Sequence, residues 1–142
     1  MAIWFSTPTL EMLNNDFHDS AAANVGITFT DIGDDYLTAS MPLDHRTQQP
    51  FGILHGGVSC VLAETVGSHA SMLCLDMEKH YCVGLDINAN HVRAASSGHV
   101  HGTARPIHIG GSTHVWGITI VDDQGRTVCA SRLTMLVKER RN

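Results

Sequence analysis

The sequence has few charged residues and no long run of one charge. Charged residues make up only 16% of the 142 residues, and 9 Lys and Arg stand against 14 Asp and Glu, so the formal net charge is −5. The one basic cluster is the short tail of Lys138, Arg140 and Arg141. Binding to nucleic acid or to an anionic membrane surface requires a larger basic surface. The composition therefore argues against nucleic acid and membranes as partners.

Cysteine motifs and long apolar runs are also missing. The four cysteines, Cys60, Cys74, Cys82 and Cys129, form no CxxC pair, which is typical of reduced thiols in a cytosolic protein. No stretch approaches the roughly 18 apolar residues of a membrane span, and the first residues lack the pattern of a secretory signal. We therefore expect a cytoplasmic location.

The pattern of apolar residues predicts one α+β domain over residues 1–142. After Pro50-Phe51-Gly52, a segment that is apolar on nearly every side predicts a buried helix from about His55 to about Leu75. Alternating residues predict a hairpin between Val25 and Met41, and four further strands with short connections follow. These strands are Tyr81–Val92, His99–Ile109, Thr113–Val121 and Thr127–Val137. Consecutive strands favour an antiparallel sheet, here wrapped around one long central helix.

A short helix is predicted near the N-terminus. Pro8 precedes Leu10, Leu13 and Phe17, whose spacings of three and four residues give one apolar face. We expect this helix to act as a lid over the domain.

Glu64 is the only charged residue between Thr47 and Leu75. Burying an ionised carboxylate without a partner is costly, so this position requires an explanation. One interpretation is a glutamate that meets a partner from the sheet and only fixes packing. The other is a carboxylate held in a cleft as a nucleophile or general base, with Cys60 and Ser68 on the same helix face.

The segment from Gln49 to Gly57 places two glycines, Gly56 and Gly57, at the start of the predicted helix. Helix N-termini expose unpaired N–H groups, and glycine allows a ligand to approach them closely. The segment is therefore either a tight entry turn or an oxyanion hole that polarises a carbonyl group.

The distance between these two features predicts a dimer. Gly56 and Glu64 are eight residues apart, about 12 Å along a helix axis, whereas a nucleophile and an oxyanion donor must both lie about 3 Å from one reacting group. Two antiparallel helices related by a twofold axis would bring Gly56 of one protomer opposite Glu64 of the other. We therefore expect an obligate homodimer with two equivalent sites at its interface.

Three segments resemble the hotdog-fold thioesterases, in the branch of 4-hydroxybenzoyl-CoA thioesterase and the PaaI-type enzymes. They are Gln49–Ser68, Val83–Arg93 and Arg105–Gly110, and the similarity extends over almost the whole chain. The resemblance implies a hotdog fold, a tetramer of two dimers and hydrolysis of aromatic acyl-CoA thioesters such as 1,4-dihydroxy-2-naphthoyl-CoA. No metal or organic cofactor is needed for this hydrolysis, because a thiolate is already a good leaving group.

The resemblance also implies residue roles. Glu64 would be the catalytic carboxylate, and the Gly56 N–H would polarise the thioester carbonyl, with His55 and Gln49 close by. Ser68 would place the attacking water, and His91 would lie at the acyl or pantetheine end. The coenzyme A channel would be lined by Gly84, His91, Val92, Arg93, Ala94, His108, Ile109, Gly110, Gly111 and Ser112.

Two positions depart from the family pattern. His69 occupies a place where relatives tend to carry an apolar residue facing the aryl group. Gly111-Ser112 stands where some relatives have a basic residue beside the nucleotide phosphates. Both departures bear on substrate binding.

Three alternatives stay open. The histidines His99, His101, His108 and His114 suggest a metal hydrolase, although an ordinary exposed strand face explains His99, His101 and His114 better because no carboxylate or thiol lies at ligand spacing. A thioesterase that clears mischarged aryl groups from an acyl carrier protein is the second alternative. The third is a non-catalytic acyl-CoA binding module in the same cleft.

Overall fold

The computed structural model describes residues 1–15 and 19–141. Helix α1 (Leu10–Asn15) confirms the short N-terminal helix. It begins after Thr9, whose hydroxyl accepts a hydrogen bond from the Met12 N–H at 3.1 Å, rather than at Pro8. Phe17, the third residue of the predicted apolar face, lies outside the described residues. Helix α2 (Ala21–Asn24) follows, capped by the hydroxyl of Ser20.

The described strands form one antiparallel sheet in the order β1-β2-β4-β5-β6-β3. The predicted hairpin and the four later strands are confirmed, with ends that differ by at most a few residues. Their bounds are Thr28–Ile32 for β1, Leu37–Pro42 for β2, His80–His91 for β3, His99–Ile109 for β4, Thr113–Asp122 for β5 and Thr127–Glu139 for β6. The pairing of β3 with β6 shifts between Gly84 and Asp86, which is the bulge expected of a glycine inside a strand.

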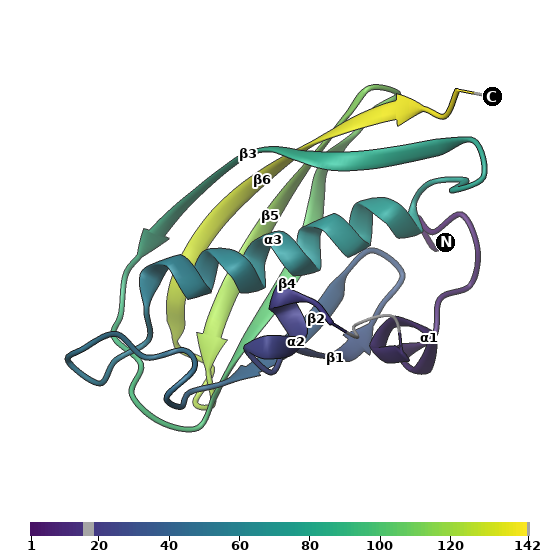
Figure 1. Ribbon diagram of the computed structural model, residues 1–142. Helices are drawn as coiled ribbons and strands as arrows, with labels where there is room; N and C mark the ends of the chain where they lie inside the picture. The colour runs from purple at the N-terminus through teal and green to yellow at the C-terminus, as the bar shows by residue number, and fades with distance from the viewer. Residues whose placement is uncertain (16–18, 142) are drawn as a thin grey trace.

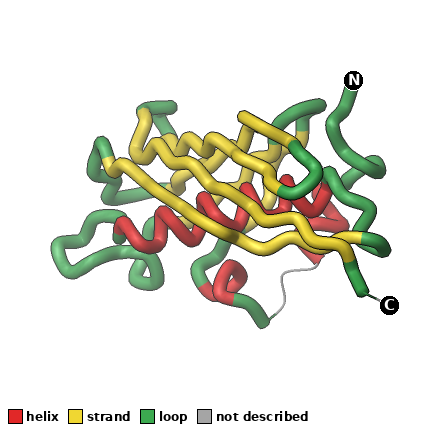
Figure 2. The backbone as a smooth tube through the Cα atoms, turned by 90° about the horizontal axis from the view of Figure 1, so that it is seen from above, coloured by secondary structure: helices red, strands yellow, loops and turns green. Residues whose placement is uncertain are grey.

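Helix α3 (Gly56–Leu73) lies along the concave side of this sheet (Figures 1 and 2). It buries Leu62, Ala63, Val66 and Ala70 against inward-facing strand residues that include Trp116, Ile118, Ile120 and Leu133. The helix ends two residues before the predicted Leu75. Cys74 is the C-cap residue of α3, and the Phe5 N–H donates to the Leu73 carbonyl at 2.8 Å. The N-terminal segment therefore contacts the C-terminal end of the helix. The arrangement confirms an α+β fold with one central helix.

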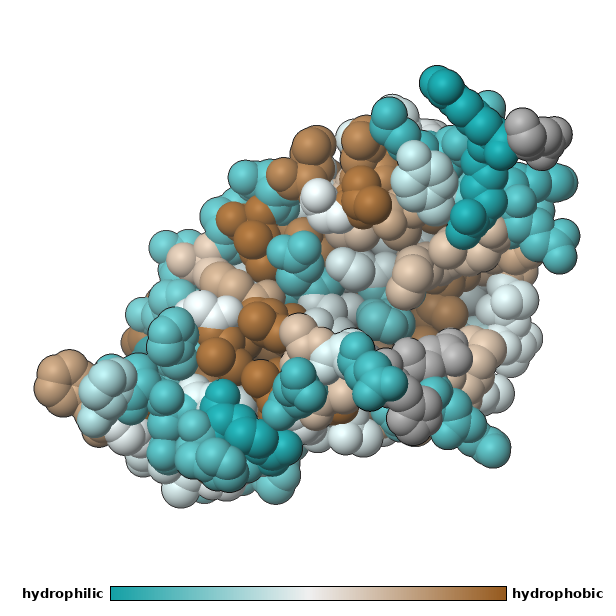
Figure 3. Space-filling view, in the orientation of Figure 1, coloured by the Kyte–Doolittle hydropathy of each residue, from teal (hydrophilic) through white to brown (hydrophobic). Residues whose placement is uncertain are grey.

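Strand β3 forms an edge of the sheet, because β6 is its only neighbour among the described strands. Its side chains Val83 and Leu85 are 47% and 60% exposed. Hydrophobic side chains also gather on the face that carries α3 and β3 (Figure 3). A long, open edge with exposed apolar side chains is the kind of strand on which another chain can pair.

The prediction that His114 lies on the strand surface is wrong. His114 is 1% exposed, and its Nδ1 lies 3.1 Å from Oγ of Ser71, which also accepts a hydrogen bond from Nε1 of Trp116 at 2.6 Å. On β5 the alternation turns His114 inward with Trp116. His99 is exposed as expected, and the half-buried His101 pairs with Asp123 at 2.7 Å.

The four cysteines are all free thiols. Among the described residues, no helix is both long enough and apolar enough to cross a membrane.

Candidate active site

The carboxylate of Glu64 projects from the middle of α3 toward β3. There it lies so close to Gly84 that a Cβ at position 84 would stand 2.5 Å from Glu64 Oε2. Within the described part of the chain, the Glu64 side chain has no hydrogen bond and no ion pair. A half-buried carboxylate with no polar partner does not fit the interpretation in which Glu64 only fixes packing.

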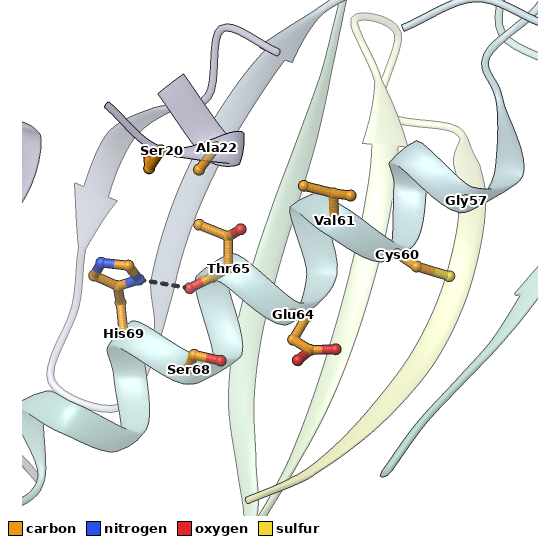
Figure 4. Close-up of a pocket in the computed structure, with 9 residues that line it drawn as sticks. All are labelled: Ser20, Ala22, Gly57, Cys60, Val61, Glu64, Thr65, Ser68 and His69. Carbon is orange, nitrogen blue, oxygen red and sulfur yellow. Dashed lines mark hydrogen bonds between the residues drawn. The ribbon is translucent and has the colours of Figure 1, made fainter. Parts of the chain in front are cut away.

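Glu64 lines a cavity of about 480 Å³ that is formed mainly by residues of α3 (Figure 4). The α3 residues around it recur every three or four positions, so they form one helix face. The structure thus brings Cys60, Glu64 and Ser68 together, as predicted. The lining residues are Ser20, Ala22, Gly57, Cys60, Val61, Glu64, Thr65, Ser68 and His69.

Two side chains in this cavity have a defined chemical state or contact. Burial, and then the negative charge of Glu64, raise the pKa of the Cys60 thiol, so Cys60 stays protonated at neutral pH. The Ser68 hydroxyl donates to Sδ of Met135 at 3.6 Å, so it is held beside the core rather than bonded to Glu64.

His69 lies at the far end of the cavity, one turn after Thr65. Its Nδ1 is 2.8 Å from the Thr65 carbonyl oxygen, and because a carbonyl can only accept, Nδ1 carries the hydrogen. The imidazole ring also packs on Phe29 with a centroid distance of 5.0 Å. A polar ring therefore stands where an apolar side chain is usual in the family that the sequence resembles.

A second cavity, of about 360 Å³, lies at the N-terminus of α3. It gathers several predicted site residues from three parts of the chain. Its lining is Gln49, Ile53, Leu54, Gly56, Ser59, His91, Val92, Arg93, Ala94 and Val128. The His91 ring lies over Gly56, since a Cβ at position 56 would stand 2.9 Å from His91 Nε2.

The first turn of α3 leaves one N–H group open. His55 is the N-cap, and its Nδ1 accepts a hydrogen bond from the Gly57 N–H at 2.9 Å. The N–H groups of Val58 and Ser59 donate to the His55 carbonyl. The Gly56 N–H has no acceptor among the described residues, so it can donate to a ligand.

The loop before α3 holds Gln49 in place. The Gln49 N–H donates to the Ile53 carbonyl at 2.8 Å, and the Gly52 N–H donates to the Gln49 carbonyl at 2.9 Å. Gly52 has a φ of +80°, which glycine adopts without strain. The Gln49 side-chain oxygen accepts a hydrogen bond from the Phe51 N–H. The segment from Gln49 to Gly57 therefore contains both a tight turn before α3 and an N–H group, that of Gly56, that is available to a ligand.

One chain keeps the two parts of the predicted site apart. Glu64 lines the first cavity, whereas Gly56 and Gln49 line the second, and the eight residues between Gly56 and Glu64 span about 12 Å of continuous helix. The separation that the sequence predicted is therefore present in the folded chain.

Some predicted residues lie elsewhere, and some lining residues were missed. Residues 108–112 form the end of β4 and the turn into β5 and line neither of these two cavities. Gly84 contacts the carboxylate itself. Val61 and Thr65 follow from helical spacing around Glu64, but Ala22 comes from α2 and Ser20 from its N-cap, and the position of this helix depends on the tertiary fold. Among the described residues, no three His, Cys, Asp or Glu side chains could hold a metal ion.

A curved antiparallel sheet that encloses one long helix, with a carboxylate of that helix facing a cavity, defines a hydrolase of the hotdog fold. Residues 51–129 match the thioesterase superfamily, and the chain belongs to this family. It is accordingly a thioester hydrolase.

Three relatives illustrate the similarity. A crystal structure of a mutant of thioesterase PA1618 from Pseudomonas aeruginosa superposes with a TM-score of 0.96 at 51% identity, covering 98% of this chain and 100% of that chain. The 1,4-dihydroxy-2-naphthoyl-CoA hydrolase of Escherichia coli K12 is 50% identical over 135 residues, which are 95% of this chain and 98% of that protein. The proofreading thioesterase EntH of Cronobacter sakazakii is 46% identical over 135 residues, with the same coverage of 95% and 98%.

Proposed function

We propose that this protein hydrolyses aromatic acyl-CoA thioesters, with 1,4-dihydroxy-2-naphthoyl-CoA or a similar aryl-CoA as substrate. The observation that carries the proposal is the Glu64 carboxylate, which lines its cavity and has no polar partner among the residues that the structure describes. The 50% identity to a 1,4-dihydroxy-2-naphthoyl-CoA hydrolase supports the choice of acyl group and suggests a place in menaquinone biosynthesis. The free cysteines support a cytoplasmic location.

In the proposed mechanism, the thioester carbonyl oxygen accepts a hydrogen bond from the Gly56 N–H, which stabilises the negative charge that develops during attack. Glu64 either attacks the carbonyl carbon and forms an anhydride that water opens, or deprotonates a water molecule that attacks. In both routes the carbon–sulfur bond breaks, and coenzyme A leaves as a thiolate. Neither route requires a metal or an organic cofactor.

The site is proposed to form between two protomers. The 12 Å between Gly56 and Glu64 prevents one helix from supplying both groups, and the open β3 edge with exposed Val83 and Leu85 offers a surface for a second copy. An antiparallel pair of α3 helices about a twofold axis would complete two equivalent sites. Association of two such dimers would give the homotetramer.

Coenzyme A is proposed to approach along the second cavity. His91, Val92, Arg93 and Ala94 line this cavity together with Gly56, with His55 and Gln49 fixing the geometry of that turn. Residues 108–112 would contact the outer part of coenzyme A from the turn between β4 and β5. Gly84 would leave room for the carboxylate beside this path.

The test is turnover by Glu64→Ala. With benzoyl-CoA and 1,4-dihydroxy-2-naphthoyl-CoA we expect kcat to fall by about 10²–10⁴-fold, the usual contribution of a positioned base or nucleophile, while the folded state and ligand binding persist. Glu11→Ala, which removes an exposed carboxylate from α1, is the matched control. A fully active Glu64→Ala enzyme would refute the proposal. After a single turnover in ¹⁸O-labelled water, label in Glu64 identifies the anhydride route with water attack at the Glu64 carboxyl carbon, whereas label in the product alone is common to the general-base route and to water attack at the acyl carbon of the anhydride.

A second candidate is a thioesterase that clears mischarged aryl groups from an acyl carrier protein. The 46% identity to a proofreading thioesterase favours it. Rates measured side by side on one aryl group, attached either to coenzyme A or to a carrier protein, separate the two candidates. A much higher kcat/KM on the carrier would favour proofreading.

A further inference from the structure

Three polar side chains meet in the interior of the protein, where α3 packs on β5. Ser71 and Trp116 are 0% exposed, and His114 is 1% exposed. Nε1 of Trp116 lies 2.6 Å and Nδ1 of His114 lies 3.1 Å from Oγ of Ser71. Buried polar groups require hydrogen-bond partners, and these side chains supply them to one another. We call Ser71, His114 and Trp116 the His114 cluster.

The hydrogen bonds of the His114 cluster have one consistent direction. The indole N–H of Trp116 can only donate, so Oγ of Ser71 accepts from it. The hydroxyl hydrogen of Ser71 is then free to be donated to Nδ1 of His114. Burial lowers the pKa of His114, so its ring is neutral at neutral pH. With Nδ1 as the acceptor, the hydrogen of the neutral ring is on Nε2.

The His114 cluster extends to the turn between β4 and β5. His114 has a hydrogen bond with the backbone of Gly110. The Gly110 N–H already donates to the Thr113 carbonyl at 2.9 Å, so the Gly110 carbonyl is the group that accepts from His114. A chain of hydrogen bonds therefore leads from Trp116 through Ser71 and His114 to the turn.

The turn has a sequence that gives its backbone much freedom. Gly110 and Gly111 are adjacent, and glycine has more accessible backbone conformations than any other residue. Gly111 and Ser112 are exposed, and a Cβ at position 111 would meet no atom within 4 Å. The Ser112 carbonyl accepts a hydrogen bond from the Val137 N–H at 2.8 Å. A buried contact under Gly110 thus restricts a segment that its own sequence leaves flexible.

The His114 cluster is separate from the groups that are proposed to carry out the chemistry. His114 and residues 108–112 line neither the Glu64 cavity nor the cavity at Gly56. Ser71 follows Glu64 by seven residues on α3, which is about 10 Å along the helix axis. A change at His114 therefore alters the turn without displacing the reacting groups.

We propose that His114 is a positioning residue, which holds the turn of residues 108–112 in place for contact with the outer, nucleotide part of coenzyme A. This inference rests on the proposed function, in which that turn contacts coenzyme A. Gly111 and Ser112 offer the phosphates no positive charge, so a turn that is fixed before binding matters more, because it lowers the cost of ordering. The buried imidazole thus contributes to KM for coenzyme A thioesters and not to kcat.

The experiment measures kcat and KM for benzoyl-CoA and for S-benzoylpantetheine, which carries the same thioester without the nucleotide. His114→Leu removes the hydrogen bonds of the ring and keeps an apolar side chain in its place. We expect it to raise KM for benzoyl-CoA by about tenfold, the usual range for the loss of one hydrogen-bonded contact. We expect kcat for both substrates and KM for S-benzoylpantetheine to stay near the wild-type values. His114→Gln retains a donor and an acceptor and should restore KM for benzoyl-CoA.

Amide hydrogen exchange reports on the turn independently of activity. The N–H groups of Gly110 and Val137 form the backbone hydrogen bonds of the turn, and both should exchange faster in His114→Leu than in the wild type. If His114→Leu does not fold, Ser71→Ala interrupts the same chain of hydrogen bonds by removing one oxygen atom, and it is judged by the same measurements.

Thr38→Val is the matched control. It removes one side-chain hydrogen bond, to Oγ1 of Thr103 at 2.8 Å, between β2 and β4. Thr38 lines neither the Glu64 cavity nor the cavity at Gly56. This variant should therefore keep the wild-type KM and the wild-type exchange at the turn.

Each outcome supports or overturns the proposal. A higher KM for benzoyl-CoA alone, with faster exchange at Gly110 and recovery in His114→Gln, supports it. An unchanged KM in folded His114→Leu, an equal rise for both substrates, or the same rise in Thr38→Val overturns it, because His114 would then act only through packing. If the wild type hydrolyses neither thioester, the proposed function fails. Normal hydrolysis by the wild type together with an unchanged KM in His114→Leu rejects only the role of His114.

Discussion

At the scale of single residues, the position of Glu64 depends on what β3 places opposite it. The carboxylate lies against Gly84, where any Cβ would stand 2.5 Å from Oε2 and 3.3 Å from Cδ. The β-bulge after Gly84 lets the strand bend at this point. The absence of a side chain at position 84 therefore leaves space for the Glu64 carboxylate. This role is more specific than the predicted one, in which Gly84 lines the coenzyme A channel.

We expect Gly84→Ala to lower kcat while leaving KM for benzoyl-CoA nearly unchanged. The added methyl group displaces the carboxylate from its place but does not enter the second cavity, which Gly84 does not line. A displacement of about 1 Å can cost about 10²-fold in rate. Steady-state kinetics on the purified variant measures both constants.

The matched control for this prediction is Gly117→Ala. It adds the same methyl group to a strand glycine where the nearest atom, Cδ1 of Ile107, is 3.5 Å away, so no clash arises. Wild-type kcat in Gly84→Ala, or equal losses in both variants, would contradict a positioning role for Gly84.

The residues of the site differ in how far the sequence could reveal them. Glu64 was found because it is the only charge in a long apolar segment, and burial of charge has a large energetic cost. The contacts of Gly84 with Glu64, and of His91 with Gly56, join segments that are distant in sequence. No local pattern encodes them, because they depend on how β3 crosses α3.

At the scale of elements, the helix and the strands were predictable because periodicity reports which side is buried. The exact end of α3 was less predictable, and there the Phe5 N–H, from a distant part of the chain, donates to the Leu73 carbonyl. His114 was misplaced although the alternation with Trp116, Ile118 and Ile120 points it inward. Its polarity suggested exposure, whereas Ser71 on α3 supplies a buried hydrogen-bond partner.

His114 ties the C-terminal half of α3 to β5 and makes this contact sensitive to acid. Burial lowers the pKa of His114 below its ordinary value of 6.5, and the neighbouring His108 lowers it further, while a hydrogen bond with the Gly110 backbone acts in the opposite direction. Near pH 6 the unfolded chain therefore binds more protons at this residue than the folded chain does. The contribution of neutral, buried His114 to the free energy of unfolding is complete above pH 6.5. It declines as the pH falls below 6.5 and is lost below the lowered pKa of His114 in the folded chain.

We expect the free energy of unfolding of the wild type to fall as the pH drops from 7 to 5, and His114→Gln to show a smaller decline over this range. Urea unfolding at several pH values measures it. His45→Gln, at an exposed histidine, is the control and should keep the wild-type slope. Identical pH dependence in His114→Gln and the wild type would assign the acid sensitivity to other groups.

At the scale of the whole molecule, a chain of 142 residues packs one long helix against one sheet and places its carboxylate and its open N–H donor in separate cavities. The sequence could predict this separation because helix geometry converts residue spacing directly into distance. It could not show which surface a second copy would use. The open β3 edge and the apolar face beside it are products of the sheet order.

Gly56→Pro offers a way to remove the N–H donor. Gly56 is the first residue of α3, where proline is tolerated because this N–H has no partner within the helix. His55 has φ −70° and ψ 127°, an extended conformation that suits a residue before proline. Gly56→Ala retains the N–H but meets His91 in the same way, so it separates loss of the donor from crowding of the ring.

Mixed dimers of Gly56→Pro and Glu64→Ala then test whether the site is shared. If Gly56 of one protomer acts with Glu64 of its partner, a mixed dimer contains one site with both groups intact and one site with neither. Co-expression with two different affinity tags and purification on both tags should yield about half of wild-type activity from two subunits that are each nearly inactive alone. If each chain formed its own site, every site in the mixed dimer would lack one group, and activity would stay at the level of the single variants.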